Sequence, residues 1–138
     1  MGKLIRILLV EDNADDETLT LRALKNIGDH ILVEVARDGE EAVRRLADDE
    51  QAVPNLVLLD LHLPKISGLE VLKRIREDER TAQILVVVLT SSDEPDDVRA
   101  CYREHSNSYI HKPVSFGEFS EVVQRLGVYW LQTNVDLF

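Results

Sequence analysis

Short apolar runs alternate with segments of helical periodicity along the whole chain. Unbroken aliphatic runs lie within residues 4–10, 56–59 and 84–89, and polar or turn-forming residues follow each run. Runs of this length are typical of strands buried on both faces, as in a parallel sheet covered by helices. At 31–36, apolar and polar positions alternate, which favours a half-exposed strand nearer a sheet edge. A short fifth strand is predicted at 108–111.

A segment with apolar residues at helical spacing follows each predicted strand. The predicted helices cover about 14–27, 39–49, 68–78, 93–105 and a last segment around 119–126. Asn13 or Asp12 is suited to cap the first helix, and Gly28 is suited to stop it. Five repeats of strand then helix predict one α/β domain, with a parallel sheet, right-handed crossovers and helices on both faces.

Chemically distinctive side chains stand where four of these strands end. Glu11 and Asp12 follow the first strand, Asp60 follows the third, Thr90 ends the fourth and Lys112 follows the fifth. In a parallel sheet these ends lie at one edge, where ligands of open α/β folds bind. We therefore expect the five side chains to lie close together.

Three neighbouring carboxylates repel one another, since a pair at ~4 Å in an effective dielectric of ~20 costs roughly 4 kcal/mol. Such a cluster persists only if it binds a proton or a cation. Hard oxygen ligands beside an open, phosphate-sized space suit Mg²⁺. Asp60 could then attack phosphorus as a nucleophile, while Lys112 and the Thr90 hydroxyl contact the other phosphoryl oxygens.

Composition excludes several partners. The chain has 138 residues and a formal net charge of -10, which argues against nucleic acid or an anionic membrane as a direct partner. Cys101 is the single cysteine, so no internal disulfide is possible, and a cytoplasmic location is expected. No apolar run approaches the length needed to span a membrane.

Taken together, these motifs resemble the receiver domain of two-component response regulators over about residues 4–127. The resemblance rests on Glu11-Asp12, on Asp60 with Pro64 and Gly68 after it, on Thr90, and on the segment 109–113. It implies a (βα)5 flavodoxin-like, doubly wound sheet of order 2-1-3-4-5. It also implies a phosphoacceptor that takes its phosphoryl group from a sensor histidine kinase and is not otherwise an enzyme.

The resemblance assigns a role to each matching position. Asp60 would be the phosphoacceptor, Asp12 a direct Mg²⁺ ligand, and Glu11 a further metal-binding residue that acts through water. The backbone carbonyl of His62 would complete the protein ligands. Lys112 would contact the phosphoryl group and precede a cis peptide bond.

A second set of positions would act in switching. Thr90 and Tyr109 would form the switch pair and act on the face built by the fourth helix, fifth strand and fifth helix. The side chains of His62 and Ser92 would tune the lifetime of the phosphoryl group.

Structural explanations compete with these roles. Asp60 could simply cap the following helix, and Glu11 and Asp12 could favour a helix start through the macrodipole. Tyr109 could be an ordinary core aromatic, and Cys101 a small packed residue.

The end of the chain suggests an interface. We divide the sequence into a receiver domain, 1–127, and a tail, 128–138, too short for an output domain, so docking of a downstream protein is expected. The apolar tail side chains either pack on the domain or form a subunit interface; the candidates are Tyr129, Trp130, Leu131 and Phe138. The tail resembles that of small regulators paired with phytochrome-type histidine kinases, which implies a homodimer.

Two other classes remain open. Haloacid dehalogenase-type phosphohydrolases also use a strand-end aspartate and Mg²⁺. Their motif is Asp-x-Asp, whereas His62 stands at the position of the second acid here. A phosphorylation-independent interaction module would require that Asp60 take up no phosphoryl group.

Overall fold

A computed structural model describes residues 4–113 and 115–133 as five strands and five α-helices in strict alternation, followed by one π-helical turn. The strands are β1 (Ile5–Val10), β2 (Ile31–Ala36), β3 (Leu56–Leu59), β4 (Leu85–Thr90) and β5 (Ser108–His111). The helices are α1 (Ala14–Lys25), α2 (Gly39–Ala47), α3 (Gly68–Glu77), α4 (Pro95–Arg103) and α5 (Phe116–Val128), with the π turn η1 at Tyr129–Thr133.

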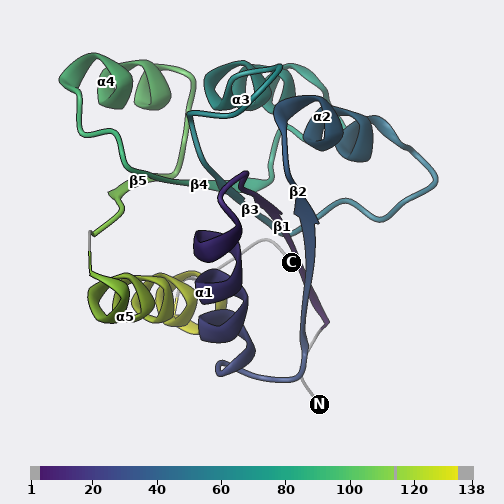
Figure 1. Ribbon diagram of the computed structural model, residues 1–138. Helices are drawn as coiled ribbons and strands as arrows, with labels where there is room; N and C mark the ends of the chain where they lie inside the picture. The colour runs from purple at the N-terminus through teal and green to yellow at the C-terminus, as the bar shows by residue number, and fades with distance from the viewer. Residues whose placement is uncertain (1–3, 114, 134–138) are drawn as a thin grey trace.

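The strands form one parallel sheet in the order β2-β1-β3-β4-β5, which confirms the predicted fold. In register, Val10 pairs with Ala36 on one side and with Leu59 on the other. Helices α1 and α5 cover one face of the sheet, and α2, α3 and α4 lie on the opposite side (Figure 1). Among the described residues, no helix is long and apolar enough to cross a membrane.

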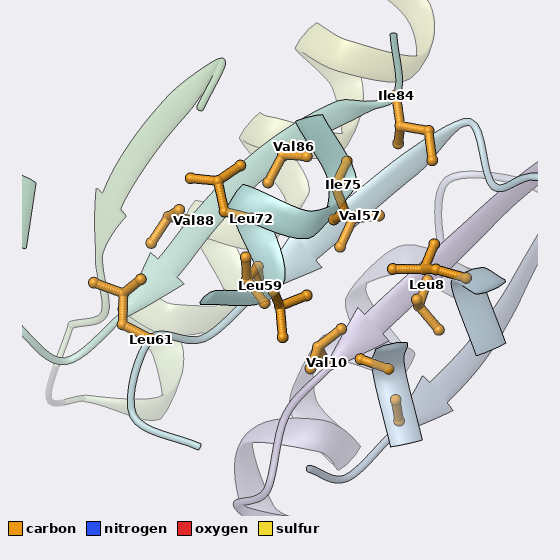
Figure 2. Close-up of a cluster of buried hydrophobic side chains, with 14 of the residues drawn as sticks. Leu8, Val10, Val57, Leu59, Leu61, Leu72, Ile75, Ile84, Val86 and Val88 are labelled. Atoms are coloured by element: carbon orange, nitrogen blue, oxygen red, sulfur yellow. The ribbon is translucent and has the colours of Figure 1, made fainter. Parts of the chain in front are cut away.

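Each face of the sheet has its own apolar core. Under α2 and α3, side chains from the central strands meet Leu72 and Ile75 of α3 (Figure 2). Cys101 of α4 is buried in the same cluster. On the opposite face, Phe119 and Val123 of α5 pack against the sheet together with α1. Burial from both sides explains why the central strands read as continuous apolar runs.

Helix starts follow the capping chemistry of the sequence. Asn13 caps α1, and its side-chain oxygen accepts a hydrogen bond from the Asp16 amide. Asp38, Ser67 and Ser115 cap α2, α3 and α5 in the same way. Helix α4 has no side-chain cap and begins with Pro95 in its first turn. These caps fix where each helix leaves the edge of the sheet.

Candidate phosphoacceptor site

The carboxyl ends of four strands meet at one edge of the sheet. Glu11 follows β1, Asp60 follows β3, Thr90 is the last residue of β4, and Lys112 follows β5. Because β1, β3, β4 and β5 are neighbours in that order, these residues come from adjacent strands. Glu11, Asp60, Thr90 and Lys112 are all buried, whereas Asp12 is exposed. The structure therefore brings the sequence-predicted group together.

Asp60 is held by both neighbouring strands. Its amide donates a hydrogen bond to the Val10 carbonyl at 3.1 Å. Its Oδ1 accepts from the Thr90 hydroxyl at 2.9 Å and from the His62 amide at 3.2 Å. Its Oδ2 accepts from Lys112 Nζ at 2.9 Å. Both carboxylate oxygens therefore have hydrogen-bond donors that keep Asp60 in place.

The backbone after Asp60 requires a glycine at the start of α3. The Gly68 amide donates to the Leu61 carbonyl at 2.9 Å. A Cβ at Gly68 would lie 2.1 Å from the Asp60 carbonyl oxygen and 2.6 Å from Leu61 Cα. This close approach of two backbone segments leaves no room for a side chain and fixes the loop that carries Asp60.

Glu11, Asp12 and Asp60 form a group suited to a cation. One carboxylate oxygen from each residue lies within 4.8 Å of those from the other two. Carboxylate oxygens are hard ligands, and an exposed member such as Asp12 leaves the group open to solvent, so the donor set fits Mg²⁺. The His62 side chain is exposed and is not a member of this group.

Lys112 supplies a positive charge inside the acidic pocket. Its Nζ lies 2.6 Å from Glu11 Oε1 and 2.9 Å from Asp60 Oδ2. A third partner, Asp16 Oδ2, is also 2.9 Å away. Lys112 therefore supplies part of the positive charge that we predicted these carboxylates to require.

Sequence reasoning missed Asp16. The available signal was its place in the first turn of α1, directly after the cap at Asn13, where a carboxylate lies at the same sheet edge as Asp12. No local pattern pairs this carboxylate with a lysine 96 residues further along the chain.

Burial and the Lys112 charge act in opposite directions on the two buried carboxylates. Burial raises the pKa of Glu11 to about 7, and this effect outweighs the hydrogen bond from Lys112. Burial also acts to raise the pKa of Asp60, but the Lys112 charge and the hydrogen bonds from Lys112 and Thr90 outweigh it and lower the pKa. Asp60 is therefore the ionised carboxylate of the pair at neutral pH.

Thr90 and Tyr109 are linked through the loop after β4. The Thr90 hydroxyl donates to Asp60, and the Tyr109 hydroxyl donates to the Ser92 carbonyl at 2.8 Å. Ser92 is buried, and its own hydroxyl donates to Asp97 Oδ2 of α4 at 2.6 Å. Tyr109 is half-buried and packs against the core cluster under α3. A physical connection thus runs from Asp60 through the loop to the β5 side chain.

The peptide bond after Lys112 corrects one expectation. No cis peptide bond occurs in the part of the chain that the structure describes, so the cis bond expected between Lys112 and Pro113 is wrong. The Lys112 ammonium reaches its three carboxylates with a trans bond in place.

The interface candidates after α5 divide into two groups. Leu131 is buried, and the half-buried Trp130 packs against the core under α1 and α5. Tyr129 is 50% exposed, with its ring edge-on to Trp130 at 5.0 Å between centroids. Phe138 lies outside the described residues. Packing within the domain therefore accounts for Leu131 without a second subunit.

The fold and site define a receiver domain. The family model of the response regulator receiver domain matches residues 7–124, so the chain belongs to the response regulator receiver family.

Individual relatives agree with this assignment. The chain is 44% identical over 131 residues to the "probable methanogenesis regulatory protein FilR2" of Methanothrix harundinacea, covering 93% of this chain and 84% of the relative. It is 41% identical over 132 residues to response regulator Rcp1 of Synechocystis sp., covering 92% of this chain and 89% of Rcp1.

Solved structures show the same likeness. The Mn²⁺-bound crystal structure of Rcp1 superposes with a TM-score of 0.93 at 37% identity, covering 97% of this chain and 99% of Rcp1. The phosphorylated cyanobacterial phytochrome response regulator RcpA superposes with a TM-score of 0.92 at 37% identity, with the same coverage of 97% and 99%. The chain thus closely resembles phytochrome-associated response regulators.

Proposed function

We propose that this protein receives a phosphoryl group on Asp60 from the phosphohistidine of a sensor histidine kinase and passes the signal on by docking. The observation that carries the proposal is the convergence of Asp60 with Thr90 and Lys112 beside the carboxylates of Glu11 and Asp12. A carboxylate that only capped a helix would not need a buried ammonium and a buried hydroxyl on its two oxygens.

The transfer itself follows from these contacts. An ionised Asp60 oxygen forms a bond to phosphorus while the bond from phosphorus to the imidazole nitrogen breaks, and its electron pair stays with the imidazole. The lowered pKa of Asp60 keeps it ionised for this attack. Lys112 and the Thr90 hydroxyl already point at Asp60, so they are placed to donate hydrogen bonds to the transferred phosphoryl oxygens.

Glu11, Asp12, Asp60 and the His62 carbonyl are the residues we assign to Mg²⁺. When bound, Mg²⁺ supplies positive charge against the developing charge of the phosphoryl oxygens. The relative Rcp1 has been solved in an Mn²⁺-bound form, which supports divalent-cation binding by this chain. The exposed carboxylate of Asp12 gives the cation a route of entry from solvent.

The output is a change on the face formed by α4, β5 and α5. In our hypothesis, Thr90 turns its hydroxyl toward the phosphoryl group, and Tyr109 occupies the space beside the loop after β4. The hydrogen bond from Tyr109 to the Ser92 carbonyl shows how the loop and the tyrosine can be coupled. The side chains of His62 and Ser92 lie beside the site and are candidates for tuning the phosphoryl lifetime.

The cognate kinase is proposed to be of the phytochrome type, acting in the cytoplasm, and the protein to form a homodimer. The likeness to the phytochrome response regulator RcpA supports the kinase type. The exposed apolar side chains of Val128 and Tyr129 support the homodimer.

Intact-mass measurement after incubation with Mg²⁺ and acetyl phosphate tests the central assignment. We expect one phosphoryl adduct in the wild type and in Asp49→Asn, because Asp49 is an exposed aspartate in the turn after α2. Asp60→Asn should carry none. An adduct that persists in Asp60→Asn would move the phosphoacceptor to another residue. Sustained hydrolysis of p-nitrophenyl phosphate would instead favour the phosphohydrolase class.

A further inference from the structure

The Lys112 ammonium has no hydrogen left to donate. An ammonium carries three N–H donors, and Lys112 directs them to Glu11 at 2.6 Å, Asp16 at 2.9 Å and Asp60 at 2.9 Å. A phosphoryl oxygen that binds Lys112 must therefore replace one of these carboxylates. The question is which of them gives up its hydrogen bond.

Asp16 differs from the other two in role and in exposure. Glu11 and Asp60 belong to the group suited to a cation, and Asp16 does not. The Asp16 side chain is 22% exposed, against 2% for Glu11 and 8% for Asp60. Water can therefore solvate the Asp16 carboxylate after release, whereas a buried carboxylate left without its partner is costly.

The backbone of Asp16 is fixed, so its carboxylate cannot follow a moving lysine far. Its amide donates to Asn13 Oδ1 at 3.0 Å, and its carbonyl accepts from the Thr20 hydroxyl at 2.7 Å. Both contacts hold Asp16 in the first turn of α1. Lys112 therefore has a stationary anchor on the side of the pocket formed by α1.

We propose that Asp16 is a positioning residue that holds the Lys112 ammonium in the unmodified protein and releases it to the phosphoryl group. This inference rests on the proposed phosphoacceptor function of Asp60. Asp16 competes with the incoming phosphoryl oxygen for the same N–H donor, so it slows phosphorylation. Removing its charge should speed the reaction.

The test compares Asp16→Asn with Asp15→Asn at saturating Mg²⁺. Asp15 is an exposed neighbour on the same helix turn, and its substitution changes the net charge equally. With acetyl phosphate as donor, we expect Asp16→Asn to be phosphorylated about three- to fivefold faster than Asp15→Asn, the range for loss of one partly exposed charge pair. Equal or slower phosphorylation of Asp16→Asn would overturn the proposal. A purely structural role for Asp16 predicts the slower result.

NMR of the Lys112 side-chain ammonium in the unmodified proteins separates this inference from the function on which it rests. Asp16→Asn should shift the Lys112 signal and speed its hydrogen exchange with water, and Asp15→Asn should leave both unchanged. An unshifted signal in Asp16→Asn would overturn the anchor. A shifted signal in a protein whose wild type takes up no phosphoryl group would overturn the proposed function and the release step with it.

Discussion

At the scale of single residues, the pKa values of two buried carboxylates, Glu11 and Asp60, are shifted in opposite directions although both contact Lys112. Glu11 has a pKa of about 7 because burial dominates, whereas the pKa of Asp60 is lowered because Lys112 and Thr90 stabilise its charge. The proposed nucleophile, Asp60, is thereby kept ionised, and Glu11 can carry a proton close to neutral pH. If Glu11 binds the cation as we propose, cation binding and proton release at Glu11 are coupled.

Affinity for Mg²⁺ or Mn²⁺ should rise as pH increases through about 7. A proton on Glu11 competes with the cation, and its raised pKa of about 7 places this competition near neutral pH. Between pH 6 and pH 8 we expect the dissociation constant to fall by up to about tenfold, as one proton is released. Mn²⁺ binding followed by electron paramagnetic resonance measures it directly.

Glu11→Gln supplies the control for this pH dependence. The glutamine amide does not titrate between pH 6 and pH 8. The variant should therefore bind Mn²⁺ more weakly at pH 8, and its dissociation constant should change less with pH over this range. A wild-type affinity that is the same at both pH values would contradict the role of Glu11 protonation.

The residue scale is also where sequence reasoning reached its limit. Asp60, Thr90 and Lys112 could be predicted to meet because each stands at a strand end and parallel strands share one edge. The Asp16 contact to Lys112 spans 96 residues and depends on the direction of two side chains, which no local pattern encodes. The hydrogen bond from Ser92 to Asp97 joins residues close in sequence, but it too depends on the direction of two side chains.

At the scale of elements, the junctions between strands and helices fix the positions of the site residues. Helix starts were predicted well where a capping residue marks them, as at Asn13. Helix ends were predicted less well: α1 ends at Lys25 rather than near residue 27, and α2 ends at Ala47 rather than at residue 49. After α1, Ile27 continues the apolar spacing because it packs on the core, so the pattern alone does not mark the end of that helix.

Gly68→Ala should destabilise the protein and impair phosphorylation together. The added methyl group would meet the Asp60 carbonyl at 2.1 Å, so the loop that carries the phosphoacceptor has to move. We expect a loss of about 2 kcal/mol or more in the free energy of unfolding, measured by urea titration. Acetyl phosphate should also label this variant more slowly.

Gly117→Ala is the matched control, because Gly117 lies in the first turn of α5 and a new Cβ there would meet Ser115 Oγ at 4.0 Å, an ordinary van der Waals contact. Alanine there should stabilise the protein by up to about 1 kcal/mol. Equal stability of the two variants would show that the loop at Gly68 accommodates the methyl group without loss of free energy of unfolding.

Arg76 should be a larger contributor to stability than its surface position suggests. Its guanidinium donates to the carbonyls of Ala82, Ile84 and His105 and to the side chain of Asn107. It thereby joins the end of α3 to the start of β4 and to the loop before β5. Arg76→Lys keeps the charge but cannot form this set of bonds, so we expect a loss of about 1–3 kcal/mol in urea unfolding.

Arg74→Lys on the same helix serves as the comparison. Arg74 is exposed, and its contact with Glu70 is a surface ion pair at 3.7 Å, so the change should stay within about 0.5 kcal/mol. If Arg76→Lys were equally mild, the guanidinium contacts would be dispensable for stability.

At the scale of the whole molecule, the described surface leaves several large apolar side chains uncovered near α4 and α5. Tyr102 is 49% exposed on α4, Phe116 is 66% exposed on α5, and Val128 and Tyr129 follow at 43% and 50%. Tyr102, Phe116 and Val128 lie on α4 and α5, which we propose to switch, and Tyr129 follows α5 directly. Leu131, by contrast, is buried, so truncation after residue 127 would remove part of the core as well as any interface. A point substitution tests the interface more cleanly.

Tyr129→Asp should convert the proposed homodimer to a monomer without loss of stability. A charge on an exposed apolar side chain costs little in the monomer, but it would be desolvated in a subunit interface. Sedimentation equilibrium should show twice the chain mass for the wild type and a single chain mass for the variant. Leu32→Asp is the control, because Leu32 is 43% exposed and lies on β2, at the opposite edge of the sheet from β5. If wild type and Tyr129→Asp were both monomeric, a partner other than a second copy would have to cover the exposed side chains. If Leu32→Asp also dissociated the dimer, the interface would extend to or lie at the β2 edge of the sheet. Only selective dissociation by Tyr129→Asp places a second copy of the chain on the switching face, where dimer formation and phosphorylation of Asp60 would then be linked through Tyr109 and the loop after β4.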